Sequence, residues 1–151
     1  MLHYSYPQVV VQEVPDEIAL ALSISGCPLN CKGCHSSETF KPTFGSPLTP
    51  DVLQDLVTKN KHITCVLFYG GEWQPDELVH LLQLVSSSNL KVALYTGLDY
   101  REVPQQLLSH LDVIKVGPYI AELGGIGSPN TNQRIITFNR RTPHDHTKRQ
   151  D

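Results

Sequence analysis

The sequence predicts an α/β fold, a small open partial β/α barrel with a mostly parallel sheet. Apolar runs typical of strands alternate with segments whose apolar residues recur at helical spacing. Helices of about ten residues between strands imply right-handed crossovers, so we expect about five mostly parallel strands. The chain of 151 residues is long enough for one domain but too short for a closed eight-stranded barrel, which needs about 200.

Each expected element follows from its local pattern. Apolar runs predict strands at residues 8–13, 19–25, 63–69, 91–96, 112–116 and 134–138. A first helix is expected to begin at Thr49-Pro50, with Thr as the N-cap and Pro at the first helical position. Helical spacing predicts two more helices, at 75–87 and 103–110. Clusters of Ser, Thr, Pro and Gly favour loops at 36–50 and 120–132.

Composition excludes several classes of protein. A hydrophobic fraction of 40% with 18% charged residues is not that of a disordered chain. The net charge of -3 gives no broad basic surface for nucleic acid. The apolar stretch at 18–24 is too short to span a membrane, and Asp16 and Glu17 stand where a secretory signal carries positive charge. We expect a cytoplasmic protein with one domain at 1–138 and a polar, flexible tail at 139–151, and no nucleic-acid or membrane partner.

Three of the four cysteines form a C-x3-C-x2-C pattern at Cys27, Cys31 and Cys34, directly after a predicted strand. Thiolates are soft ligands that suit iron–sulfur clusters and zinc. Three thiolates on a cluster with four irons leave one iron without a protein ligand, whereas a structural zinc site prefers four closed ligands. The pattern therefore favours a [4Fe–4S] cluster with one iron open to a substrate or cofactor.

Other interpretations of the cysteines remain open at this point. His35 is a candidate fourth ligand for a structural zinc, although it directly follows Cys34 and neighbouring residues rarely both reach one tetrahedral ion. A disulfide with one remaining thiol, or three unconnected cysteines, are further alternatives, and a reducing cytoplasm disfavours the disulfide. The fourth cysteine, Cys65, lies within an apolar run and is expected to be a buried strand residue.

Three features lie at the ends of predicted strands: the cysteine segment at 27–34, Gly70-Gly71-Glu72, and Thr96-Gly97. In a parallel sheet the ligand site lies beyond the carboxyl ends of the strands, so these features are expected to converge on one face. Lys115 lies late in another predicted strand, where its side chain either faces the site or points outward into solvent.

The cysteine pattern resembles the signature of the radical S-adenosylmethionine superfamily. The usual aromatic residue before the third cysteine is here Gly33, and the segment 26–35 is similar to the cluster loop of anaerobic ribonucleoside-triphosphate reductase activating proteins. Gly70-Gly71-Glu72, Tyr95-Thr96-Gly97 and the segment 127–135 resemble further motifs of that family. Trp73 departs from it, since the glycine motif normally continues with Pro, and the segment 127–135 has a two-residue insertion.

The resemblance implies a radical S-adenosylmethionine activase with a [4Fe–4S] cluster and S-adenosyl-L-methionine as cofactors. It implies that Cys27, Cys31 and Cys34 ligate the cluster. The implied cofactor-binding residues are Gly70, Gly71, Glu72, Thr96, Gly97 and Lys115, with no catalytic residue beyond the cluster and cofactor.

The implied substrate is a glycine of the large subunit of anaerobic ribonucleoside-triphosphate reductase, on which a glycyl radical forms. An open partial barrel suits a macromolecular substrate whose own loop completes the enclosure of the radical. A flavodoxin-type protein is a plausible electron donor. The alternatives are a radical enzyme acting on another glycyl-radical enzyme or a small molecule, and a zinc- or cluster-binding interaction module without turnover.

Overall fold

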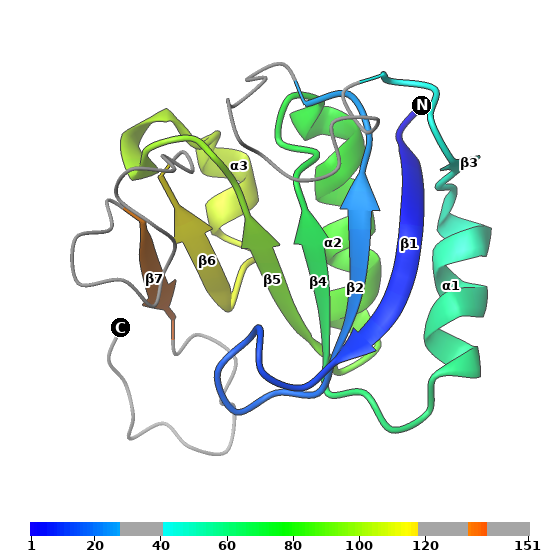
Figure 1. Cartoon of the computed structure of the whole chain (residues 1–151). Coiled ribbons are helices and arrows are strands. Elements are labelled where there is room, and N and C mark those ends of the chain that lie inside the picture. The colour runs from blue at the N-terminus through cyan, green and yellow to red at the C-terminus, as the bar shows by residue number, and fades with distance from the viewer. Residues whose placement is uncertain (28–40, 118–132, 139–151) are drawn as a thin grey trace.

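The structure is a computed structural model that describes residues 1–27, 41–117 and 133–138. Its core is a seven-stranded sheet in the order β3-β1-β2-β4-β5-β6-β7 (Figure 1). The elements are β1 (His3–Val10), β2 (Ala19–Ile24), β3 (Ser46–Pro47), α1 (Pro50–Lys59), β4 (Cys65–Tyr69), α2 (Pro75–Ser87), β5 (Lys91–Tyr95), the 3-10 turn η2 (Tyr100–Glu102), α3 (Gln105–Leu108), β6 (Val113–Val116) and β7 (Arg134–Thr137).

The centre of the sheet is parallel and its edges are antiparallel. Strands β2, β4, β5 and β6 run in the same direction, as the alternation of strands and helices predicts. Strand β1 pairs antiparallel with both β2 and β3, and β7 pairs antiparallel with β6. The predicted open, mostly parallel α/β sheet is thus confirmed, with antiparallel strands added at both edges.

Several predicted boundaries were wrong. The first strand begins at His3 rather than residue 8, and the segment predicted as a loop at 36–50 contains β3. The third helix covers only Gln105–Leu108 instead of 103–110, because Pro104 takes the extended φ and ψ of an N-cap. The predicted loop at 120–132 and the tail at 139–151 lie outside the described residues.

The helices pack on one side of the sheet, behind the strands in Figure 1. Helix α1 begins as predicted, with the Thr49 hydroxyl accepting a hydrogen bond from the Val52 N–H at 3.2 Å. Helix α2 buries one apolar stripe, made of Leu78, Leu81, Leu82 and Val85. This stripe packs against alternate side chains of the central strands, including Leu22, Phe68 and Leu94. None of the described helices is both long and apolar enough to cross a membrane.

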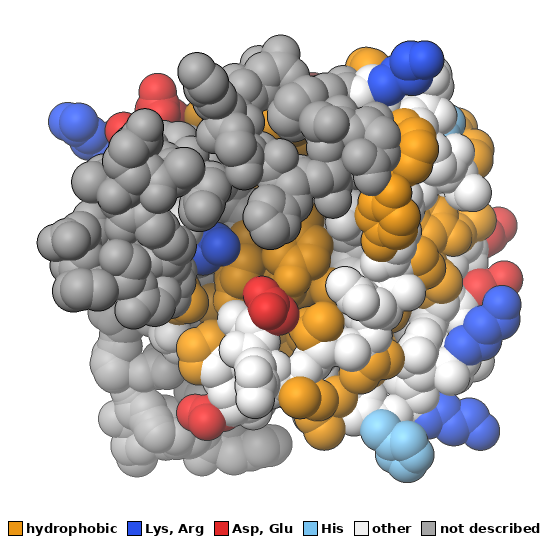
Figure 2. Space-filling view, in the orientation of Figure 1, with side chains coloured by type: hydrophobic (Ala, Val, Ile, Leu, Met, Phe, Trp, Pro, Cys, Tyr) orange, Lys and Arg blue, Asp and Glu red, His pale blue; other side chains and the backbone are white. Residues whose placement is uncertain are grey.

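No described helix covers the other face of the sheet, which faces the viewer in Figures 1 and 2. Its side chains are mostly small near the middle of the strands, with Ala21, Cys65 and Ala93 fully buried. Val14, from the loop between β1 and β2, packs on these residues. Figure 2 shows hydrophobic side chains gathered at the centre of this face. We call it the helix-free face.

Candidate functional site at the carboxyl ends of the parallel strands

Two strand ends turn on glycines. Gly26 follows β2 with φ +98°, and Gly70 and Gly71 follow β4 with φ +98° and +107°. Side chains other than glycine rarely adopt such angles, so these turns account for the glycines seen in the sequence. The Gly70 N–H donates to the Tyr95 carbonyl at 3.0 Å, which joins the glycine turn to the end of β5. The predicted convergence of these strand ends is therefore seen in the described residues.

Glu72 is a buried acid at this edge of the sheet, with 4% of its surface exposed. Its Oε1 atom is buried and has no hydrogen-bond partner in the described part of the chain. Burial raises the pKa of the Glu72 carboxyl, while its own backbone N–H and the Thr96 hydroxyl oppose the shift. An acceptor oxygen kept out of water without a donor is costly, so it is suited to receive a donor from a ligand.

Thr96 links this acid to the neighbouring strands. Its hydroxyl accepts from the Leu98 N–H at 3.1 Å and forms a hydrogen bond with Glu72. Its backbone N–H donates to the Lys115 carbonyl at 2.9 Å. The hydroxyl and the backbone thus fix Thr96, and the half-buried Gly97 after it, between β4 and β6. The structure therefore brings Gly70, Glu72 and Thr96 together, as the sequence predicts.

Lys115 lies on the helix-free face rather than in open solvent. It is half-buried, and its ammonium group lies 4.8 Å from the centre of the Tyr95 ring. Burial lowers the pKa of the Lys115 ammonium, and the charge of Glu13 opposes the shift. Lys115 is thus neither fully solvated nor fully buried, and it offers a partly desolvated cation near the strand ends.

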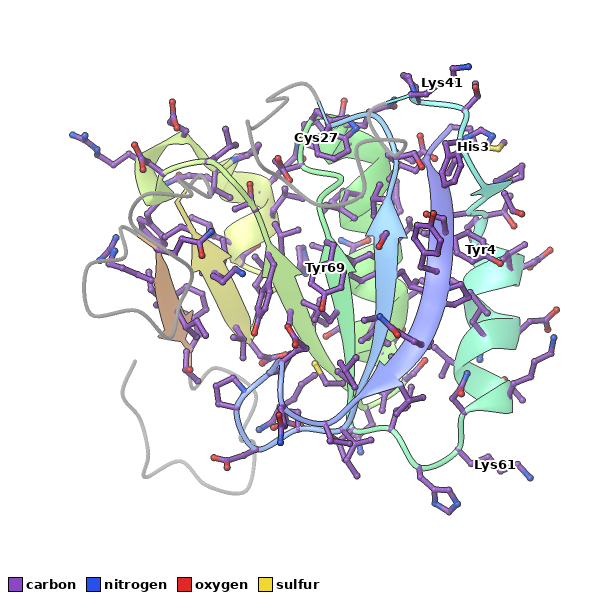
Figure 3. All side chains as sticks on the ribbon, viewed as in Figure 1. His3, Tyr4, Cys27, Lys41, Lys61 and Tyr69 are labelled. Carbon is purple, nitrogen blue, oxygen red and sulfur yellow. The ribbon has the colours of Figure 1, made fainter. Side chains whose placement is uncertain are left out.

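Sequence reasoning missed the polar group that surrounds Lys115. The rings of Tyr69 and Tyr95 meet edge to face with 6.0 Å between their centres. The Tyr69 hydroxyl donates to Glu13 Oε1 at 3.3 Å, and the Tyr95 hydroxyl donates to the Glu13 carbonyl. Figure 3 shows Tyr69 near the middle of this face. The two tyrosines end neighbouring strands in register, and this position at the strand ends could have predicted their contact. Nothing in the local sequence places Glu13 beside them.

Only the first cysteine of the pattern lies within the described residues. Cys27 is half-buried and directly follows the Gly26 turn, whereas Cys31 and Cys34 lie outside them. Figure 3 shows Cys27 at the upper end of the sheet, above β2 and β4. Residues 1–27, 41–117 and 133–138 contain no other group of three potential metal ligands. Cys65 is fully buried in β4, which confirms it as a core residue.

Further polar residues lie around β7. Gln133 is buried, and its amide donates to the Gly117 carbonyl at 3.2 Å, which ties the start of β7 to the end of β6. Arg134 is exposed on β7, and Asn132 lies outside the described residues. Gln133 therefore holds the start of β7 against the carboxyl end of β6.

The residues present fit the expected cofactors. The unpartnered oxygen of Glu72 can accept from an ammonium group, and Lys115 can neutralise a carboxylate. The methionyl end of S-adenosylmethionine carries both groups. Cys27 begins a thiolate-rich segment beside them, and thiolates are the usual ligands of iron–sulfur clusters.

Comparison with known proteins agrees with this chemistry. The family model of the 4Fe-4S single cluster domain matches residues 18–136. An anaerobic ribonucleoside-triphosphate reductase-activating protein of Vibrio cholerae is 29% identical over 90% of this chain and 97% of its own length. A pyruvate formate-lyase-activating enzyme of Clostridium pasteurianum is 29% identical over 64% of this chain, which spans 44% of that relative.

The match covers most of the chain, including β2, the glycine turn and β6. Both similar proteins are activating enzymes. The chain therefore belongs to the 4Fe-4S single cluster domain family and is a radical S-adenosylmethionine enzyme of the activating class, with a [4Fe–4S] cluster and S-adenosylmethionine as cofactors.

Proposed function

We propose that this protein activates an anaerobic ribonucleoside-triphosphate reductase by generating a glycyl radical on its large subunit. The observation that carries the proposal is the match to the Vibrio cholerae activating protein, over 90% of this chain and 97% of that relative. More than half of the pyruvate formate-lyase-activating enzyme has no counterpart here, since only 44% of it is matched. The more extensive match therefore favours the first target over the second.

Each predicted site residue has a role in the proposal. Cys27, Cys31 and Cys34 hold three irons of the cluster and leave the fourth open. Glu72 accepts from the cofactor ammonium, Lys115 neutralises its carboxylate, and the bare backbone of Gly70 and Gly71 lets the methionyl group approach. The Thr96 hydroxyl holds Glu72 in place, and Gly97 continues the same edge. When bound, the reduced cluster and S-adenosylmethionine supply a one-electron reductive cleavage that yields a hydrogen-abstracting radical.

The helix-free face is where the target glycine is expected to enter. The ends of β4, β5 and β6 present Tyr69, Tyr95 and Lys115 on this face, and no described helix covers it. A radical must be kept from water, and an inserted segment of the partner can complete that enclosure. This supports a protein substrate over a small molecule.

Further proposals concern the context of the protein. A flavodoxin-type protein reduces the cluster in the cytoplasm, where the thiols stay reduced. Residues 1–138 form the domain that holds both cofactors, and the basic, polar residues 139–151 follow it.

The test is electron paramagnetic resonance on anaerobic mixtures. The reconstituted protein, S-adenosylmethionine and dithionite are mixed with the large subunit of an anaerobic ribonucleoside-triphosphate reductase or, in parallel, with pyruvate formate-lyase. A glycyl-radical doublet only in the first mixture supports the proposal. A doublet only with pyruvate formate-lyase, or release of 5′-deoxyadenosine without a doublet in either mixture, overturns the choice of target.

A further inference from the structure

Trp73 lies between two glycine turns that are far apart in the sequence. A Cβ atom built on Gly26 would lie 3.3 Å from the indole Nε1, and one built on Gly70 would lie 2.6 Å from Cη2. These atoms belong to opposite ends of the indole. The ring therefore bridges the turn after β2 and the turn after β4, and it fills the space that a side chain at either glycine would need.

The same contact lies at the base of the cysteine segment, by which we mean residues 25–27 and 41–44. Gly26 also meets Pro42, whose Cα lies 3.3 Å from the built Cβ. Nearby, the Ser25 hydroxyl donates to the Phe44 carbonyl at 2.7 Å. The chain before Cys27 and the chain after residue 41 thus meet beside the indole. The indole of Trp73 lies between this junction and the glycine turn.

Trp73 is itself held in place. It is half-buried and directly follows Glu72. Its side chain packs against the apolar core between the sheet and the helices, which we call the helix-side core. The next residue, Gln74, donates its N–H to the Gly71 carbonyl at 3.0 Å, and helix α2 begins at Pro75. The indole is therefore anchored to a rigid helix start and not to a free loop.

We propose that Trp73 is a positioning residue that fixes the base of the cysteine segment against the Gly70-Gly71-Glu72 turn. It sets the separation between Cys27, which begins the cluster ligands, and Glu72, which faces the cofactor ammonium. Small misplacements in such a site are costly, since an error of about 1 Å can lower a rate about a hundredfold. The inference rests on the assigned cofactors and not on the identity of the target protein.

Fluorescence of the protein gives a direct first test, because Trp73 is the only tryptophan. We expect anaerobic assembly of the cluster to quench its emission several-fold, since the indole lies beside the residue that precedes Cys27. Cys31→Ala treated in the same way should keep the emission of the metal-free protein. Equal emission before and after assembly in the wild-type protein would overturn the placement of Trp73 beside the cluster segment.

Substitution tests the positioning role. Trp73→Ala should weaken S-adenosylmethionine binding at least about tenfold and abolish the change that the cofactor causes in the paramagnetic spectrum of the reduced cluster. Trp73→Phe keeps a flat ring at this position but is too short to contact both glycines, so it should restore each property only in part. These readouts need no reductase, so they can fail while the proposed target stands, and the reverse holds as well.

Phe138→Ala is the matched control. Phe138 is also a half-buried aromatic residue packed against the helix-side core, but its N–H bonds to the Asp112 carbonyl at the opposite end of β6. A purely structural role for Trp73 predicts equal losses of melting temperature in both alanine variants with an unchanged cofactor-induced spectrum, and that result would overturn the proposal. If Trp73→Ala does not fold, the wild-type quenching and the Trp73→Phe spectra decide.

Discussion

Glu13 accepts a hydrogen bond from the Tyr69 hydroxyl at 3.3 Å, across 56 residues of sequence. The backbone carbonyl of the same residue accepts from the Tyr95 hydroxyl. One residue of the loop between β1 and β2 is thereby bonded to the ends of β4 and β5. The two bonds hold this loop on the helix-free face, and they bring an acid close enough to Lys115 to act on its pKa.

The two tyrosines predict a loss of stability at alkaline pH. Burial, with Glu13 adding to it, raises the pKa of both Tyr69 and Tyr95 above the ordinary value of about 10. The unfolded chain then loses its phenolic protons first, so the stabilisation is complete below pH of about 10 and declines as the pH rises above it.

Tyr69→Phe tests this dependence. It should lower the free energy of unfolding by about 0.5–1.5 kcal/mol near neutral pH, through the lost hydrogen bond, and flatten its decline at high pH. The measurement is urea unfolding from pH 7 to 11. A decline as steep as that of the wild-type protein would contradict the assignment to Tyr69.

Glu72→Gln should separate function from stability. Loss of the charge should weaken S-adenosylmethionine binding by roughly 1.5–3 kcal/mol, or at least tenfold, if the carboxylate meets the cofactor ammonium. Because the pKa of Glu72 is raised in the folded protein, ionisation of this carboxyl destabilises the folded state. The destabilisation is absent at low pH and present above the pKa that Glu72 has in the unfolded chain.

The cofactor-free Glu72→Gln variant should therefore melt higher than the wild-type protein at neutral pH. Binding is followed by equilibrium dialysis of the reconstituted protein and stability by thermal unfolding of the cofactor-free form. Asp55→Asn removes an exposed acid of α1 and should change neither quantity. Unaltered cofactor affinity in Glu72→Gln would remove Glu72 from the binding site.

Gly70→Ala should destabilise the cofactor-free protein by about 1–3 kcal/mol, because φ is +98° and the added methyl group would overlap the Trp73 ring. In a Trp73→Ala background only the backbone strain remains, so the two substitutions should cost less together than their separate costs added. A double-mutant cycle by urea unfolding measures the difference. Strict additivity would mean that the ring moves aside at no cost.

The cysteines predict a clear contrast in iron content. Cys31→Ala should bind much less iron after anaerobic reconstitution and release no 5′-deoxyadenosine, because it removes one of three thiolate ligands. Cys65→Ala should keep both properties, since Cys65 is fully buried in the core at the start of β4 and its thiol donates to the Val66 carbonyl rather than to the cluster. Iron is measured per chain by colorimetric assay. A full complement of iron in Cys31→Ala would contradict the ligand assignment.

The central fold was predictable because its signals are local. Thr49-Pro50 marks the start of α1, and the apolar run before Gly70 marks β4. The glycine turn and Thr96 also meet as predicted, because parallel strands present their carboxyl ends at the same edge.

The remaining features depend on pairings that local sequence does not encode. β3 has only two residues and no periodicity, and the antiparallel direction of β1 follows from its partner β2. Glu13 carries no sign of its contacts with Tyr69 and Tyr95, since these arise from the path of a loop across the sheet. Trp73 could be noticed as an unusual residue, but its place between Gly26 and Gly70 is visible only in three dimensions.

The pairing of β2 with β4 also bears on the order of folding. Ile18 and Thr64 are bonded at the start of this pair across 46 residues, about twice the separation between the paired ends of β4 and β5. Loop closure costs more entropy as the loop lengthens, so the β4-α2-β5 unit is expected to form first and β2 to join it later. Cys27, Cys31 and Cys34 lie within the longer loop. In a partly folded chain the glycine turn would therefore form before the cysteine segment is placed beside it. We therefore expect the cofactor site, which needs both segments, to be complete only after β2 has docked.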